Sequence, residues 1–131
     1  MNLGLKGIQK YIYLQVIDLS CNGLTTLAPL SNIKHLLKLN ASGNQLTTML
    51  DFEPSAALEW VDLSNNQISK IENVARNPYL RQLFLDRNQI ETIENLADNT
   101  HLRVLSLNEN RIKRIENIDG INLEELYLSQ N

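Results

Sequence analysis

Leucine and isoleucine return along this chain on a fixed long period. The clearest copy of the pattern covers residues 80–88, where Leu-Arg-Gln-Leu-Phe-Leu-Asp-Arg-Asn has the form Leu-x-x-Leu-x-Leu-x-x-Asn. The copies begin at residues 14, 36, 58, 80, 102 and 123, so the units are 22 residues long except for the fifth, which is 21. Such a period predicts a stack of short units, each of which buries one face against its neighbour.

Within each unit we expect a short strand at positions 3 to 5, with inward side chains at positions 1, 4 and 6. Alternation along a strand sends the intervening residues to the solvent side. Asparagine follows at position 9, where its amide can bond to backbone groups of the turn and of the neighbouring coil. The predicted ladder consists of Asn22, Asn44, Asn66, Asn88, Asn110 and Asn131.

Positions 11 and 14 carry a second apolar pattern, which predicts another buried column running from Leu24 and Leu27 to Ile112 and Ile115. In the later units an asparagine follows two residues after position 14, where a short helical turn would begin, and asparagine is a preferred N-cap. We therefore expect 3₁₀ or single-turn helices on the convex side. The second unit is the least regular, and residues 51–55 predict a local irregularity filled in part by Phe52.

This arrangement fits the leucine-rich-repeat signature. It predicts an α/β repeat solenoid, in which a parallel β-sheet lines the concave face of a horseshoe and short 3₁₀ or helical turns line the convex face. We expect one leucine-rich-repeat domain over residues 1–131, with a partial repeat at 1–13. Neither end carries a polar cap, which a stack needs where its core is open, so we expect the chain to be a fragment of a longer protein.

Composition narrows the class of protein. The net charge of −3 carries no basic excess or stripe, so we expect neither nucleic-acid nor membrane-surface binding. A single cysteine excludes an internal disulfide and favours the reducing cytoplasm. No apolar run is long enough for a membrane span, and the first residues lack the apolar stretch of a signal peptide.

The repeat unit resembles the cytosolic repeat class of the nuclear regulatory subunit of protein phosphatase 1 and of axonemal dynein light chains. Residues 14–22 (Leu-Gln-Val-Ile-Asp-Leu-Ser-Cys-Asn), 37–42, 46–48 and 66–69, together with the shortened fifth unit, resemble the repeat region of the leucine-rich repeat and guanylate kinase domain-containing protein family. That resemblance implies a guanylate-kinase-like domain after the repeats and an association with flagella and microtubules. The phosphate-binding motif Gly-x-x-x-x-Gly-Lys-Ser/Thr does not occur in this sequence.

Catalytic, cofactor and metal sites have little support in the sequence. His35 and His101 lack partners at metal-ligand spacing, and Cys21 lacks an adjacent basic group that would activate it. The N-glycosylation sequon at residues 40–42 falls on a predicted strand of a chain that we place in the cytoplasm, so we do not expect glycosylation there. The convex acidic residues Glu72, Glu94 and Glu116 are expected to be solvated and to pair with Lys70, Lys113 or Arg114. We therefore predict no enzymatic activity and no cofactor.

The concave surface is where we expect function. Its third-position residues are Val16, Lys38, Trp60, Gln82, Val104 and Glu125, and its fifth-position residues are Asp18, Asn40, Asp62, Phe84, Ser106 and Tyr127. Trp60 and Phe84 fall on adjacent strands as diagonal neighbours, and exposed aromatics on a sheet are typical of binding hot spots. Arginines 81, 87, 103 and 111 edge the same repeats, which favours a partner with an apolar ridge and an acidic flank. The predicted partner-binding residues are Lys38, Trp60, Asp62, Phe84, Arg87, Val104 and Tyr127.

We therefore predict a scaffold for protein–protein interaction, in the cytoplasm and within a cytoskeletal, ciliary or flagellar assembly. Two alternatives stay open. One is a module like a protein phosphatase 1 regulatory subunit, and the other is the repeat region of a multidomain enzyme whose guanylate-kinase-like domain lies outside this chain. Neither the identity of the partner protein nor the oligomeric state follows from the sequence.

Overall fold

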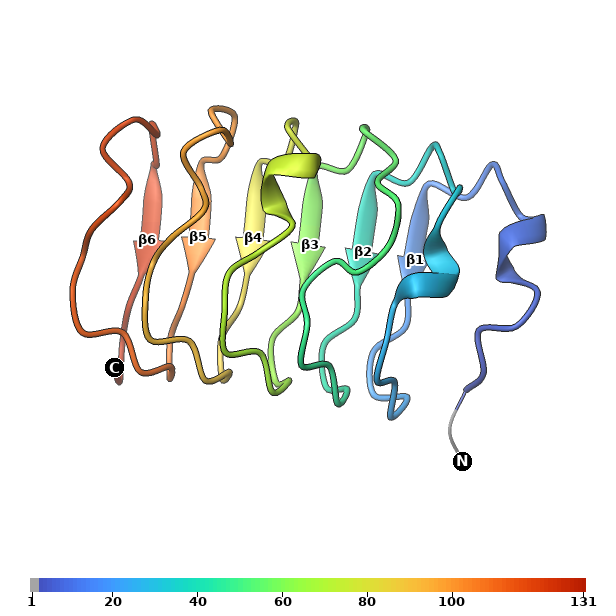
Figure 1. The fold of residues 1–131 in the computed structure, drawn as a ribbon, viewed down its shortest axis with the longest axis horizontal. Coiled ribbons are helices and arrows are strands. Elements are labelled where there is room, and N and C mark those ends of the chain that lie inside the picture. Colours follow the sequence, from blue (N-terminus) through green and yellow to red (C-terminus); the bar gives the residue numbers. More distant parts are fainter. Residues whose placement is uncertain (1–2) are drawn as a thin grey trace.

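In the computed structural model of the protein, residues 3–131 form one stack of coils with six parallel strands along one side (Figure 1). The strands follow one another in chain order, and each is hydrogen-bonded to the next. They are β1 Val16–Asp18, β2 Lys38–Asn40, β3 Trp60–Asp62, β4 Gln82–Phe84, β5 Val104–Ser106 and β6 Glu125–Tyr127. Every strand thus occupies the third to fifth positions of its repeat, which confirms the predicted strands and the predicted leucine-rich-repeat fold.

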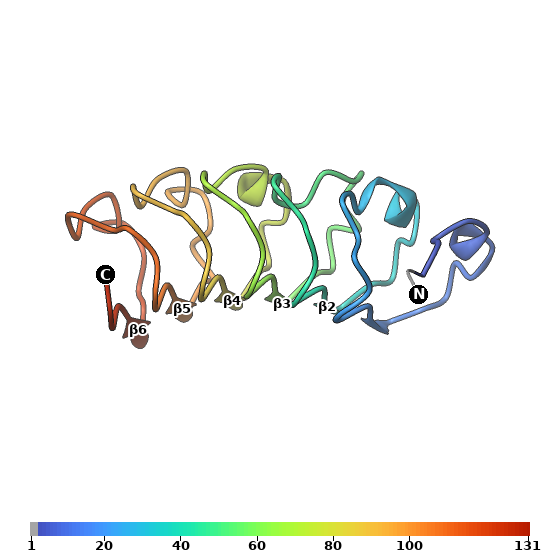
Figure 2. The ribbon, with the colours of Figure 1, turned by 90° about the horizontal axis from the view of Figure 1, so that it is seen from below.

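The strands pair in a constant register. The first residue of each strand lies beside the first residue of the next, as with Val16 and Lys38 or Gln82 and Val104. Figure 2 shows the strands along the inner side of a shallow arc, with the returning coils on the outer side. Equivalent positions of neighbouring repeats are therefore side by side, and this rule decides which side chains can meet.

The coils on the outer side contain three short 3₁₀ helices, which are η1 Ile8–Lys10, η2 Ala28–Leu30 and η3 Val74–Arg76. They confirm the predicted single turns in those coils. The coils that follow β2, β4 and β5 return without a helix. In the part of the chain that the structure describes, no helix has the length and apolar character needed to span a membrane.

The prediction that the convex asparagines cap helices is wrong. Asn73 stands before η3, but its side chain makes no capping hydrogen bond and its backbone is left-handed, with φ 61°. Its amide nitrogen instead donates to the carbonyl of Met49 in the preceding coil, at 2.7 Å. Asn95 and Asn117 repeat both the conformation and the bond. In all three residues the left-handed backbone accompanies a side-chain hydrogen bond to the preceding coil, so these asparagines link neighbouring coils.

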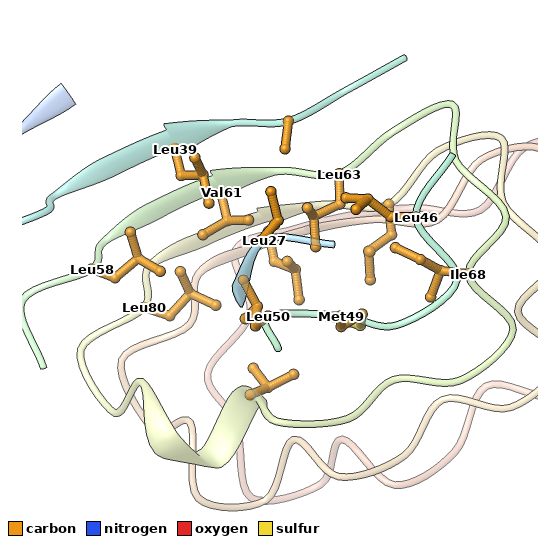
Figure 3. Close-up of a cluster of buried hydrophobic side chains, with 14 of the residues drawn as sticks. Leu27, Leu39, Leu46, Met49, Leu50, Leu58, Val61, Leu63, Ile68 and Leu80 are labelled. Carbon is orange, nitrogen blue, oxygen red and sulfur yellow. The ribbon is translucent and has the colours of Figure 1, made fainter. Parts of the chain in front are cut away.

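The core is a continuous layer of aliphatic side chains between the sheet and the outer coils (Figure 3). The inward residues of β2 to β5 are fully buried, as predicted, and Leu39, Leu58 and Leu80 have no exposed surface. The outer coil of the fifth repeat differs. Ile115, expected in the buried column, is 67% exposed, because no described coil packs against its outer side.

The second repeat is irregular where the sequence predicts it. Leu50 has a left-handed backbone with φ 46°, which is unfavourable for a branched side chain. Phe52 is 4% exposed and packs into the core, and Ala41, the small inward residue directly after β2, is completely buried. The prediction that Phe52 fills this part of the core is therefore confirmed.

The asparagine ladder is also confirmed. The amide oxygen of Asn88 accepts the backbone N–H of Ile68 in the preceding repeat. Its amide nitrogen donates to the carbonyls of Leu63 and Leu85. Equivalent bonds to the preceding repeat recur at Asn44, Asn66, Asn110 and Asn131. The four buried members, at residues 44, 66, 88 and 110, thus satisfy backbone groups of two coils that would otherwise be buried without partners. Asn131 makes its bonds at the surface, and the Asn22 side chain donates only within its own repeat.

Candidate functional site

The concave face of the sheet presents the first and last residue of each strand, because the middle residue points into the core, except that Ser106 at the end of β5 is only 3% exposed. Val16, for example, is 63% exposed while Ile17 beside it is 7% exposed. The three-residue strands therefore display two columns of side chains in the order that the repeat pattern predicts. These columns form the candidate binding face.

Trp60 and Phe84 are in contact at the middle of this face. Their ring centroids are 5.6 Å apart and their planes are inclined by 48°. The register pairs Trp60 with Gln82 and Asp62 with Phe84, so the two rings meet diagonally across β3 and β4, as predicted. Both side chains are half-buried. A tilted pair of this kind contributes about 0.5–1.5 kcal/mol beyond its buried area, and it leaves apolar ring surface open to a partner.

A shallow hollow of about 520 Å³ continues this apolar surface toward β6. Phe84, Val104 and Tyr127 form its apolar lining. Tyr127 is 44% exposed, and its hydroxyl donates to the carboxylate of Glu125 at 2.7 Å. The structure therefore brings three of the predicted residues together, and Trp60 joins them through Phe84.

The predicted charged residues are more scattered. Lys38 is exposed on β2 beside Trp60. Asp62 accepts the backbone N–H of Ser64, so one oxygen of its carboxylate already has a hydrogen-bond partner at the end of β3. Arg87 lies past the end of β4 and forms an ion pair with Glu109 of the next repeat at 3.1 Å. Arg87 does not line the hollow.

Phe84 interrupts a polar motif that the first three strands share. Asp18, Asn40 and Asp62 each accept the backbone N–H of the serine two residues later. A phenyl ring cannot accept such a bond, and in the next repeats the acceptor moves to Asp86. The Asp86 carboxylate accepts the Ser106 hydroxyl and the backbone N–H of Asn108.

Asn108 in turn accepts the backbone N–H and the hydroxyl of Ser129. The Asp/Asn–Ser bonds at the strand ends therefore lie within each of the first three repeats. From Ser64, which accepts the backbone N–H of Asp86, the polar network runs between neighbouring repeats. Sequence reasoning did not predict this network. The loss of the Asp/Asn-x-Ser spacing at residues 84–86 is the signal that could have revealed it.

Two groups on this face have shifted pKa values. The backbone N–H of Ser20 and then its hydroxyl stabilise the charged carboxylate and hold the pKa of Asp18 below its ordinary value of 3.8. The hydrogen bond from Tyr127 to Glu125, and then the negative charge of that carboxylate, raise the pKa of the Tyr127 hydroxyl above its ordinary value of 10.0. Both groups keep their usual charge at neutral pH.

The other residues considered from the sequence lie outside this face or lack chemical partners. Cys21 is exposed beyond the end of β1. His35 stacks on Tyr13 with ring centroids 5.9 Å apart, and His101 contacts Tyr79 at 5.4 Å. Among residues 3–131, no cluster of three or more His, Cys, Asp or Glu side chains could hold a metal ion.

The predicted ion pairs of the convex acidic column are wrong. Within the described chain, the salt bridges join Arg76 to Glu53, Arg87 to Glu109 and Lys113 to Glu91. The latter two join equivalent positions of neighbouring repeats, which the stack places side by side. Glu72, Glu94 and Glu116 occupy one such position, so their neighbours along the stack are carboxylates instead of basic groups.

Comparison with protein families finds two matches. A model described as Leucine Rich repeats (2 copies) matches residues 57–98, and a model described as Leucine Rich Repeat matches residues 13–33. No curated protein matches the chain.

Solved structures with the same fold include two internalins of Listeria monocytogenes. Internalin InlF superimposes with a TM-score of 0.87 at 23% identity, and internalin C2 with a TM-score of 0.82 at 26% identity. The alignments cover 97% and 93% of this chain but 38% and 54% of the internalin chains, so this chain spans about half of their length or less.

A TLR13–ssRNA13 complex also aligns, with a TM-score of 0.79 at 27% identity over 92% of this chain and 18% of the TLR13 chain. The repeats at residues 13–33 and 57–98, the parallel strands and these similar folds together support a leucine-rich-repeat protein.

Proposed function

We propose that this protein is a non-enzymatic module for protein–protein interaction and that it binds its partner on the concave sheet. The observation that carries the proposal is the half-exposed contact between Trp60 and Phe84. Phe84 stands where the three preceding strands place a hydrogen-bonding Asp or Asn, so its ring surface replaces a polar contact of the fold. The leucine-rich-repeat fold is itself typical of protein-binding modules.

A protein is a better partner than nucleic acid for this surface. The net charge of −3 does not favour a polyanion. The TLR13 structure contains ssRNA13, but that is a property of TLR13. The cytoplasmic setting stays a prediction from the single cysteine. The cytoskeletal or ciliary setting and the phosphatase-like and guanylate-kinase alternatives stay predictions from the family resemblance.

The size of the sheet limits how a partner can bind. Strands about 4.8 Å apart make a six-stranded sheet about 24 Å wide, which gives roughly 400–500 Å² of strand surface. A standard interface buries about 800 Å² on each partner. We therefore expect the partner also to contact the loops after β4 and β5, where Arg87 and Glu109 form their ion pair.

The proposal is tested by affinity capture followed by calorimetry. Immobilised wild-type protein and the Trp60→Ala and Phe84→Ala variants are exposed to the same cell extract, and the retained proteins are compared by mass spectrometry. A partner of the concave face is retained by the wild type and lost with both variants. In calorimetric titration with that purified partner, each variant should lose more than about 2 kcal/mol of binding free energy, as hot-spot aromatics do.

The matched controls are Glu72→Ala and Glu94→Ala on the convex side, which should leave the affinity within error. Circular dichroism and urea unfolding establish that all four variants are folded. If the convex variants lose affinity while the aromatic variants keep it, the concave-face assignment is wrong.

A further inference from the structure

Two arginines stand side by side where β4 and β5 begin. Arg81 and Arg103 occupy equivalent positions, and the backbone N–H of Arg103 donates to the carbonyl of Arg81 at 2.9 Å. Glu59 and Glu124 occupy the same position in the repeats on either side. Elsewhere equivalent positions of opposite charge do pair, yet across residues 3–131 neither of these two arginines forms an ion pair.

The guanidinium of Arg103 is held in place by its own backbone. Its Nη1 donates to the carbonyls of Thr100 and Leu102, both at 2.9 Å. The side chain is half-buried, so its orientation is fixed, while Nε and Nη2 have no hydrogen-bond partner in the described part of the chain. Arg81 is exposed beside it. A preorganised guanidinium loses less entropy when it binds an anion.

Both arginines line the hollow whose apolar surface is formed by Phe84, Val104 and Tyr127. Asp86 and Glu125 line it as well, but the Asp86 carboxylate is occupied by Ser106 and Asn108, and Glu125 accepts the Tyr127 hydroxyl. Glu124 also lines the hollow, at the same repeat position as the two arginines and beside Arg103. Among the residues that the structure describes, the unpaired cationic donors of the hollow are therefore the guanidinium groups of Arg81 and Arg103 where β4 and β5 begin, next to the apolar surface of Phe84, Val104 and Tyr127.

We propose that this hollow binds an extended segment of a partner protein through an Asp or Glu side chain and a neighbouring bulky apolar side chain. The carboxylate bonds to Arg81 and Arg103, which suit the two-oxygen geometry of that group. The apolar side chain packs on Phe84, Val104 and Tyr127. This inference rests on the proposed concave-face function and names the chemistry of its partner.

A single carboxylate suits this charge pattern better than a nucleic-acid backbone does. Nucleic-acid binding gains its free energy from many phosphate contacts. Beyond the two arginines, the hollow is lined by Asp86, Glu124 and Glu125, which would repel further phosphates. One anionic side chain between the two arginines brings a single negative charge near those carboxylates, where a nucleic-acid backbone would bring several.

The inference is tested with a displayed library of random linear peptides, selected on the wild-type protein after depletion on an Arg81→Gln/Arg103→Gln variant. The selected sequences should share an acidic residue close to a Leu, Phe or Trp. In fluorescence anisotropy, a synthetic selected peptide should bind the double variant and the Arg81→Gln variant about tenfold or more weakly than the wild type. Changing the acidic residue of that peptide to its amide should have the same effect.

Arg76→Gln is the matched control, because Arg76 lies in η3 on the outer side of the stack and does not line the hollow, and it should leave the affinity unchanged. Urea unfolding checks that Arg103 variants keep the fold, and Arg81→Gln provides the test without disturbing the carbonyl contacts of Arg103. An absence of peptides that prefer the wild type would overturn the inference.

Two further outcomes separate this inference from the proposed function. Peptides that bind Phe84→Ala more weakly but bind the Arg81 and Arg103 variants as tightly as the wild type would overturn the inference and leave the concave face as the binding surface. Peptides whose affinity is unchanged by both Phe84→Ala and Trp60→Ala would count against the concave face as the binding surface. Displacement of the peptide by oligouridine, with the same dependence on Arg81 and Arg103, would assign the arginines to a nucleic-acid backbone and overturn the inference.

Discussion

The amide oxygen of Asn88 accepts a hydrogen bond from the backbone N–H of Ile68, twenty residues earlier in the chain, at a distance of 3.0 Å. The same side chain donates to carbonyls of both its own repeat and the preceding one. One buried amide therefore completes the backbone hydrogen bonding of two coils.

Replacing Asn88 with alanine should lower the free energy of unfolding by about 1–3 kcal/mol, because buried backbone groups lose their partner. Asn88→Asp should also be destabilising, since a carboxylate cannot donate to the carbonyls of Leu63 and Leu85. Urea titration followed by circular dichroism measures both effects. The control is Gln89→Ala at the exposed neighbouring position, and equal midpoints for Asn88→Ala and Gln89→Ala would show that the ladder does not stabilise the fold.

The convex asparagines separate backbone strain from hydrogen bonding. Asn95 has a left-handed backbone with φ 62°, and its side chain donates to the carbonyl of Ile71. Asn95→Gly removes the hydrogen bond without straining the left-handed backbone and should cost about 0.5–1.5 kcal/mol. Asn95→Ala should cost about 1–2 kcal/mol more, because alanine is strained in this conformation.

Asn65 is the control for that pair. It has a similar backbone, with φ 56°, and lies exposed on the loop after β3. Asn65→Gly should therefore be nearly neutral, while Asn65→Ala shows the strain alone. If the alanine and glycine variants of Asn95 unfold at the same urea concentration, the left-handed conformation is not a constraint on stability.

Phe84 should matter less for stability than its hydrophobic character suggests. Phe84→Asn restores the residue type that β2 carries at this position, but the backbone N–H of Asp86 already donates to the Ser64 hydroxyl, so the new side chain replaces no missing acceptor. The variant loses the half-buried contact with Trp60, and we expect a loss of about 1–2 kcal/mol in the free energy of unfolding. Leu83→Ala, at the fully buried neighbouring position, should cost about 2–5 kcal/mol. Comparable losses for the two variants in thermal and urea unfolding would assign Phe84 to the core.

The lowered pKa of Asp18 makes a prediction about pH. A carboxylate whose pKa is lower in the folded state than in the unfolded state stabilises the fold above the unfolded value of 3.8, and this stabilisation is lost as the pH falls through the lower folded value. In NMR titration the Asp18 carboxyl should therefore have a midpoint below 3.8.

Asp18→Asn provides the control, because asparagine at the equivalent position of β2 accepts the same pair of bonds from Ser42. This variant should lose less stability than the wild type when the pH is lowered from neutral into the acid range. A midpoint for Asp18 at or above 3.8 would contradict the proposed effect of Ser20.

The repeat pattern predicted the strands, the inward positions and the asparagine ladder, because each of these features recurs at the same position of every stacked repeat. It also predicted that Trp60 and Phe84 are diagonal neighbours. In a constant register, the repeat position of a residue determines which residues of the next strand lie beside it. The predicted role of Asn73 as a helix cap was wrong. Its amide could bond within its own turn or to the preceding coil, and the left-handed backbone conformation decides between these two bonds.

The electrostatic part of the face could not be predicted from the sequence. Arg81, Arg87 and Arg103 each have a glutamate at the same position of a neighbouring repeat, yet Arg87 is paired with its glutamate, Glu109, while the other two are free of ion pairs in the described structure. Side-chain geometry decides this difference. The exposure of Ile115 likewise depends on whether another coil packs beside it, which its own repeat does not specify.

The asparagine ladder also determines how the chain acquires its structure. Its cross-repeat bonds join residues 19 to 25 apart, so closing each new coil requires only a short loop and an already folded neighbour. Folding can therefore begin in any well-packed pair of coils and grow outward one coil at a time. Unravelling reverses this order, so amide protons around the fully buried Leu63 and Leu85 should exchange with solvent most slowly, and those of the outermost coils most rapidly.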